Sequence, residues 1–126
     1  RGECIGITPD GPRGPRMRAS DGIVSVARLA GVPILPVTYA TSRRRILSSW
    51  DRFLIALPFG RGVFIWGDPI GVPREASESD LVDIRQSIEN QLILISNQAD
   101  EKCDQTSIEP AAAEIDGTND ARQGVA

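Results

Sequence analysis

The 126-residue sequence contains no histidine, only two cysteines, and a single lysine among its fourteen basic residues. Without histidine the chain lacks the commonest general base and the commonest metal ligand, so Ser-His-Asp or Cys-His chemistry would need residues from elsewhere. Two isolated thiols, Cys4 and Cys103, provide neither a metal cluster nor a disulfide framework. We therefore expect a reducing cytosolic setting and no metal site.

Long apolar runs are also missing. No stretch approaches the roughly 18–20 apolar residues that span a bilayer, and no signal-peptide pattern follows Arg1. The length suits one domain or part of one. Because the sequence opens on "GECIGITP", which resembles a strand already under way, we expect the chain to begin inside a longer protein.

Charge is distributed unevenly along the chain. Residues 1–74 hold eleven arginines against five acidic residues, whereas residues 75–126 hold three basic residues against twelve acidic ones. The first part therefore carries a positive field and the end a negative one. The arginines cluster at 13, 16 and 18 and at 43 to 45. Guanidinium groups suit bidentate recognition of phosphate or carboxylate.

The residue pattern predicts an α/β fold. The short apolar run at 3–8 predicts a strand, and the spacing of apolar residues at 20–31, with Ser20 or Asp21 as a cap, predicts a helix. A second strand is expected at 32–41, which is nearly all apolar through Val37, as in parallel sheets covered on both faces. Strand, helix and strand in this order form a βαβ unit.

Beyond residue 41 we expect a short strand extension and an irregular apolar loop over 42–62, then a further strand at 62–67. Ser77 and Asp80 resemble a capping box that begins an amphipathic helix over 77–98. Its apolar residues recur at spacings of three and four: Leu81, Ile84, Ile88, Leu92 and Ile95. Polar, acidic composition follows, so we divide the chain into a folded part, 1–98, and a disordered acidic tail, 99–126.

The stretch "TPDGPRGPRMR" (8–18) combines fixed proline angles with permissive glycines and predicts a rigid turn between strand and helix. Ligands of open α/β sheets gather at such places, and a helix start favours anions. Arg13, Arg16 and Arg18 would then form an anion site. An ordinary surface turn is the main alternative.

Other interpretations of this stretch are weaker. A proline-rich peptide ligand is usually found in disordered linkers, two collagen-like triplets cannot sustain a triple helix, and Gly-Lys-Ser/Thr of a P-loop is absent. No nucleic-acid partner is expected, because the basic patch has little aromatic interleaving. Trp50, Phe53 and Phe59 are interpreted as core residues, with a membrane-interface role as the alternative.

"TPDGPRGP" followed by "GVPILPV" resembles the third and fourth motif blocks of the lysophospholipid acyltransferase superfamily. Pro9, Asp10, Gly11 and Arg13 match the Pro-Glu-Gly-x-Arg part of the third block, with aspartate in place of glutamate. The fourth block, Val-Pro-Ile-Val-Pro-Val, is matched by Val32, Pro33, Ile34, Pro36 and Val37. With "SWDRF" and "LPF" downstream, the form resembles one bacterial branch, long filed as a domain of unknown function. The resemblance covers roughly residues 1–98.

The resemblance implies a partial acyltransferase domain on the cytoplasmic face of the bacterial inner membrane. It implies acyl transfer from acyl-CoA or acyl-carrier protein, as co-substrate, to a hydroxyl of a lysolipid acceptor. Arg13 is the counterpart of the arginine that holds the acceptor phosphate, Asp10 and Gly11 belong to the same block, and Pro33 and Pro36 shape the neighbouring wall. Arg16 and Arg18 would be secondary phosphate contacts.

The catalytic His-x-x-x-x-Asp of that superfamily has no counterpart in this chain, which contains no histidine. The sequence therefore predicts the acceptor-binding half of such an enzyme, with no catalytic residue of its own. The alternative is a non-catalytic remnant that binds anions or a membrane surface.

Overall fold

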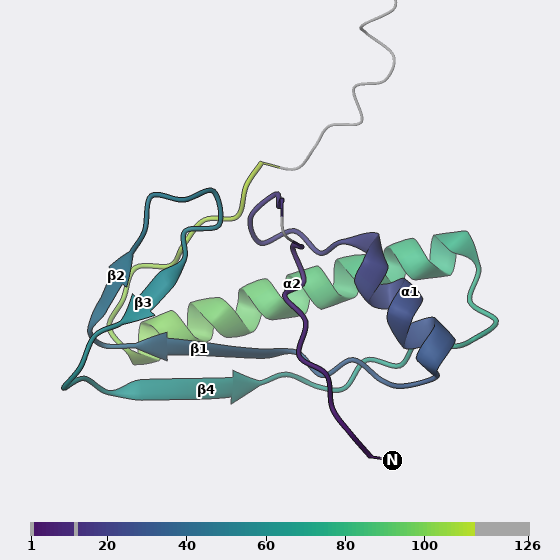
Figure 1. The fold of residues 1–126 in the computed structure, drawn as a ribbon, viewed down its shortest axis with the longest axis horizontal. Coiled ribbons are helices and arrows are strands. Elements are labelled where there is room, and N and C mark those ends of the chain that lie inside the picture. Colours follow the sequence, from purple (N-terminus) through teal and green to yellow (C-terminus); the bar gives the residue numbers. More distant parts are fainter. Residues whose placement is uncertain (1, 12, 113–126) are drawn as a thin grey trace, which may run out of the picture.

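The computed structural model describes residues 2–11 and 13–112. It combines two helices with small antiparallel sheets, which agrees with a mixed α/β class at the coarse level. The elements in chain order are α1 (Asp21–Ala30), β1 (Val37–Thr41), β2 (Arg44–Ile46), β3 (Leu54–Ala56), β4 (Gly62–Trp66) and α2 (Glu78–Lys102). The long helix α2 runs beside the strands and α1 packs against its first half (Figure 1).

The predicted βαβ unit is wrong, because every strand pair among the described residues is antiparallel. β1 pairs with β4, from Val37 opposite Trp66 to Thr41 opposite Gly62. The apolar run before Val37 makes only one isolated bridge, between Ile34 and Ile70. Prolines at 33 and 36 lack the N–H groups that a continuous ladder needs, so the run cannot serve as a central strand.

The strand predicted at 3–8 is also not formed. Residues 2–7 have no regular secondary structure, and Ile5 and Ile7 are exposed. A strand needs a neighbour to satisfy its backbone groups. No backbone hydrogen bond of residues 2–7 to another described residue supplies one.

The region 42–62 is more regular than the sequence predicted. β2 pairs with β3 from Arg44 opposite Ala56 to Ile46 opposite Leu54. Backbone hydrogen bonds from Ser42 to Arg61 and from Leu57 to Arg43 join this hairpin to the β1–β4 pair. Residues 37–47 and 53–66 therefore form one bent two-stranded structure, which we call the ribbon (Figure 1).

Both helices begin close to where the sequence predicts. α2 starts with the capping box: the Asp80 N–H donates to Ser77 Oγ at 3.2 Å, and the Ser77 N–H donates to Asp80 Oδ2 at 3.0 Å. Such a cap contributes about 1 kcal/mol to helix stability. α1 has Ser20 at its N-cap position and Gly31 at its C-cap, although the Ser20 side chain makes no capping hydrogen bond.

The predicted apolar stripe of α2 faces the core. Leu81, Ile88 and Ile95 are buried, and Ile88 is fully enclosed. Ile84 and Leu92 are partly buried and pack against the same cluster. A first core cluster joins α1 to α2 through the buried residues Val24, Ala27, Val72, Leu81 and Ile88, and a second joins the ribbon to the end of α2 through Ala40, Ala99 and Cys103.

The predicted disordered tail from residue 99 is corrected over its first part. α2 continues through Lys102, so the boundary at 98 falls inside the helix. Residues 105–112, which we call the strap, run back over the molecule (Figure 1). Gln105 Nε2 donates to the Ser42 carbonyl at 2.7 Å, and the Ala111 N–H donates to the Arg16 carbonyl at 3.0 Å. Residues 113–126 lie outside the described part.

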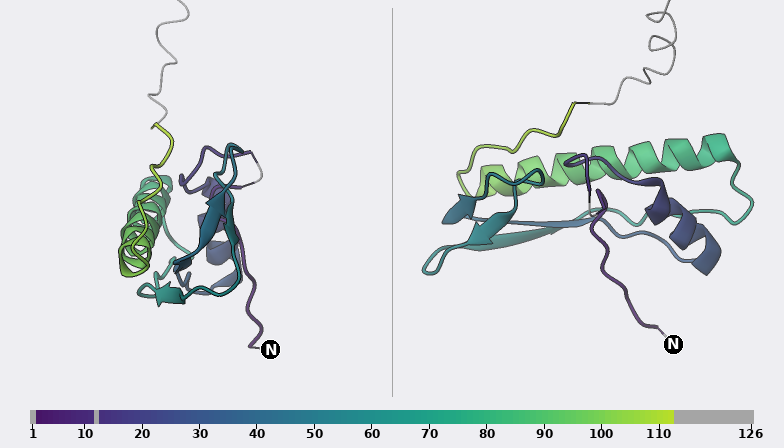
Figure 2. Two further views of the ribbon diagram at one scale, coloured as in Figure 1. Left: turned by 90° about the vertical axis from the view of Figure 1, so that its left-hand side faces the viewer. Right: turned by 45° about the horizontal axis from the view of Figure 1, so that its top comes forward.

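Figure 2 shows α2 on one side of the ribbon and the N-terminal segment on the other. α2 is mostly polar on its solvent side. Within the described residues, neither helix has the length and apolar character to cross a bilayer.

Candidate functional site

The stretch that carries the family resemblance forms a closed loop in front of α1. We call residues 9–11 and 13–20, the part of this segment that the structure describes, the arginine loop. The Ser20 N–H donates to the Pro9 carbonyl at 2.8 Å and joins the two ends. Inside the loop, the Met17 N–H donates to Asp10 Oδ2 at 3.3 Å. Asp10 therefore stabilises the loop, as expected for a turn residue.

Arg13 lies on this loop with an exposed side chain. Its guanidinium makes no hydrogen bond or ion pair with another described residue, whereas Arg16 and Arg18 both do. An arginine that is held on a closed loop and keeps all its donors available can bind an external anion in bidentate geometry.

The arginine loop rests on the tip of the β2–β3 hairpin. Gly14 has φ +77°, and a Cβ at that position would lie 2.5 Å from Trp50 Cζ3, so the close approach requires glycine. Beside it, Arg16 Nη1 donates to the Trp50 carbonyl at 3.2 Å. Trp50 was interpreted as core from the sequence, but its side chain is partly exposed and supports the loop.

Arg18 and Glu89 fix the other end of the loop to α2. Arg18 Nη1 donates to Glu89 Oε1 at 2.8 Å, and the Ala19 N–H donates to Glu89 Oε2 at 3.0 Å. Burial by itself raises the pKa of Glu89, but the hydrogen bonds from Arg18 and Ala19 and the Arg18 charge hold that pKa below its ordinary value. Glu89 therefore stays ionised at neutral pH and anchors the loop.

The strap occupies donors that were predicted to contact phosphate. Arg16 Nε donates to the Glu109 carbonyl at 2.8 Å. Arg18 Nε and Nη2 donate to the Ala111 carbonyl at 2.8 and 2.6 Å. Of the three loop arginines, Arg13 alone makes no hydrogen bond or ion pair with another described residue.

Pro33 and Pro36 lie beyond the opposite end of α1 from the arginine loop. Pro33 is exposed, whereas Pro36 is buried and its carbonyl accepts a 2.8 Å hydrogen bond from Gly67. No hydrogen bond joins this segment to Arg13 among the described residues. The expectation that these prolines form a wall beside Arg13 stays a prediction.

A second buried ion pair lies below the hairpin. Arg44 Nη1 donates to Asp100 Oδ1 at 2.7 Å, and both side chains are almost fully buried. Burial raises the pKa of Asp100 above its ordinary value, although the charge and hydrogen bond of Arg44 act in the opposite direction. Arg44 also donates to the Thr106 carbonyl, so it holds the ribbon, α2 and the strap together.

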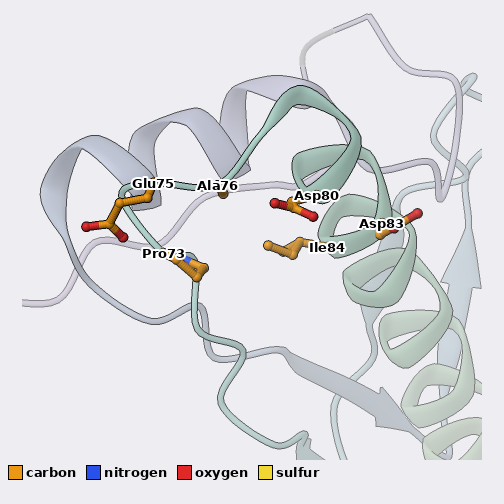
Figure 3. Close-up of a pocket in the computed structure, with 6 residues that line it drawn as sticks. All are labelled: Pro73, Glu75, Ala76, Asp80, Asp83 and Ile84. Carbon is orange, nitrogen blue, oxygen red and sulfur yellow. The ribbon is translucent and has the colours of Figure 1, made fainter.

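A hollow in the described part lies away from the arginine loop. It has a volume of about 330 Å³ and lies where the chain enters α2 (Figure 3). Its lining includes three acidic residues, Glu75, Asp80 and Asp83. Three carboxylates repel phosphate, so the hollow does not fit the predicted acceptor. No group of three metal-ligating side chains converges within residues 2–11 and 13–112.

The residues that sequence analysis missed are Glu89, Trp50 and the strap carbonyls. The sequence position of Glu89 could have indicated that it is buried, since it directly follows Ile88 in the apolar stripe of α2. An acid beside a buried stripe needs a cationic partner. Strap contacts through backbone carbonyls carry no such signal, because every residue has a carbonyl.

Comparison with known proteins identifies a bacterial relative. A protein of Rickettsia prowazekii (strain Madrid E) named Uncharacterized protein RP090 is 36% identical to this chain over 81 residues, which make up 64% of this chain and 37% of the relative. This chain thus spans a little over a third of that protein's length. No protein-family model matches the chain, and no solved structure matches it.

Proposed function

We propose that this chain is the acceptor-binding part of a lysophospholipid acyltransferase-like protein and that Arg13 binds the acceptor's phosphate. The observation that carries the proposal is the Arg13 side chain, which is exposed and without a protein partner in the described part, on a loop closed by its own hydrogen bonds. The matching third and fourth motif blocks supply the substrate class.

The chemistry of the loop supports a phosphate ligand. A guanidinium presents parallel N–H donors that match two phosphate oxygens, and it stays charged at all physiological pH values. Arg16 lies three residues away and adds positive charge to the same loop, although its Nε is engaged by the strap.

The remaining parts of the reaction lie outside these residues. The resemblance assigns the deprotonation of the acceptor hydroxyl to a histidine. Because this chain has no histidine, we propose that residues outside this sequence supply that base. We propose an acyl thioester, acyl-CoA or acyl-carrier protein, as donor, and a position on the cytoplasmic face of the bacterial inner membrane, where lysolipids are found.

The test is a titration of the chain with glycerol 3-phosphate, a small phosphate monoester with free hydroxyls, followed by NMR shifts of loop amides. Arg13→Gln is expected to weaken binding about tenfold to a hundredfold, since hydrogen bonds to charged groups contribute roughly 1.5–3 kcal/mol. Glycerol, which lacks the phosphate, should not bind.

Arg74→Gln is the matched control, because it removes another exposed arginine that lies next to Gly31, at the far end of α1. It should leave affinity within about twofold. Equal binding by the Arg13→Gln variant and the unaltered chain would reject Arg13 as the phosphate ligand.

A further inference from the structure

The ribbon has one covered face and one open face. Thr38 and Ala40 point toward α2, where Thr38 Oγ1 lies 3.1 Å from Ser96 Oγ and Ala40 packs with Ala99. Side chains alternate along a strand, so their neighbours point away from α2. We call this second surface the outer face. Its apolar members are exposed: Val37, Tyr39, Ile55, Leu57, Phe64 and Trp66.

The outer face is rich in aromatic side chains. Phe64 and Trp66 are 69% and 63% exposed, and the Tyr39 and Phe64 rings lie 5.9 Å apart. Phe59, at the bend of the ribbon, is 95% exposed. Large exposed apolar side chains that cluster in this way are typical of a surface that binds a protein, a membrane or a ligand.

The ribbon also carries positive charge. Residues 37–66 contain five arginines and a single acidic residue, Asp51. Arg44 turns inward to Asp100, so its neighbours Arg43 and Arg45 project from the opposite side, and both are exposed. Arg61 forms an exposed ion pair with Asp104 at 3.4 Å, which water screens strongly.

We propose that the outer face of the ribbon docks on an anionic lipid bilayer. Tryptophan, tyrosine and phenylalanine prefer the bilayer interface, and arginines beside them bind anionic headgroups. The opposite side of the molecule is acidic, since residues 78–104 expose five acidic residues against one basic residue, Lys102, with Glu89 and Asp100 buried. A negative surface would therefore repel α2 and attract the ribbon, which fixes one orientation.

This inference deepens the proposed function, because an enzyme acting on a lysolipid meets it at a bilayer. Binding to a bilayer is nevertheless measured independently of glycerol 3-phosphate binding. The probe is vesicles of phosphatidylglycerol and phosphatidylcholine in equal parts, which contain no phosphate monoester, compared with vesicles of phosphatidylcholine alone. The chain is expected to co-sediment with the anionic vesicles and to release in high salt, where surface charges are screened.

Two variants of the outer face separate its charge from its apolar contacts. Arg43→Gln with Arg45→Gln should weaken vesicle binding roughly thirtyfold, since each arginine near an anionic surface contributes about fivefold. Phe59→Ser with Phe64→Ser should weaken it to a similar degree by removing apolar burial. Both pairs are exposed, and circular dichroism checks that each variant keeps its helices.

The control variant carries Val82→Ser with Leu94→Ser on α2, where both side chains are also exposed. It should bind vesicles like the unaltered chain. Equal binding by the outer-face variants overturns the proposal. Self-association that both outer-face variants abolish, without vesicle binding, also overturns it and makes a second copy of the chain the occupant. If glycerol 3-phosphate does not bind but the anionic vesicles do, only the role proposed for Arg13 is contradicted.

Discussion

At the scale of single residues, Glu89 determines how the arginine loop is held. Its two carboxylate oxygens accept from Arg18 and from the Ala19 N–H, and its side chain is buried. Glu89→Gln is expected to lower the free energy of unfolding by about 1–3 kcal/mol, less than for a fully enclosed pair because Arg18 is partly exposed. Urea unfolding of both proteins at neutral pH measures this difference.

The pH dependence of the same difference has a definite sign. The folded pKa of Glu89 lies below its ordinary value, which is about 4.3 in an unfolded chain. Its stabilising contribution is therefore fully present above that pH and is lost as pH falls through the folded pKa. The difference in free energy of unfolding between the unaltered chain and Glu89→Gln should therefore become smaller as the pH falls. A difference in unfolding free energy that stays constant from about pH 7 to about pH 3 would contradict this role. Glu101→Gln, on the exposed side of α2, is the control variant.

At the scale of elements, the helices were predictable and the strand partners were not. The capping box of Ser77 and Asp80 and the three-and-four spacing of the apolar stripe are local signals, and both are confirmed. Strand pairing depends on contacts far apart in sequence, so an apolar run at 32–41 could not reveal that its partner is β4. The turn character and charge of the arginine loop were visible, but its attachment to Glu89 and the strap was not.

The strap is the element that most affects the loop. Removing residues 105–126 should free Arg16 Nε and two donors of Arg18, which now bind the Glu109 and Ala111 carbonyls. We expect this truncation to tighten glycerol 3-phosphate binding about tenfold, since more charged donors become available. A chain that ends at residue 112 keeps the strap and is the matched control. Unchanged or weaker binding by the shorter chain would show that strap contacts do not compete with the anion.

At the scale of the whole molecule, both core clusters lie beneath α2, and stability should follow that distribution. Local opening requires little free energy where few apolar contacts and backbone hydrogen bonds exist. Amides of α2 around Ile88, which is fully buried, should exchange with deuterium only through global unfolding. Amides of the β2–β3 hairpin, which Arg44 connects to α2 and to the strap, should exchange at intermediate rates. Residues 2–7 make no backbone hydrogen bond with other described residues, so their amides should exchange almost as in an unfolded peptide.

Hydrogen exchange read by mass spectrometry after pepsin digestion measures all three classes. If the amides of 2–7 proved as protected as those of α2, the segment would be paired as the strand that its apolar sequence predicts, and the outer side of the molecule would need a different description.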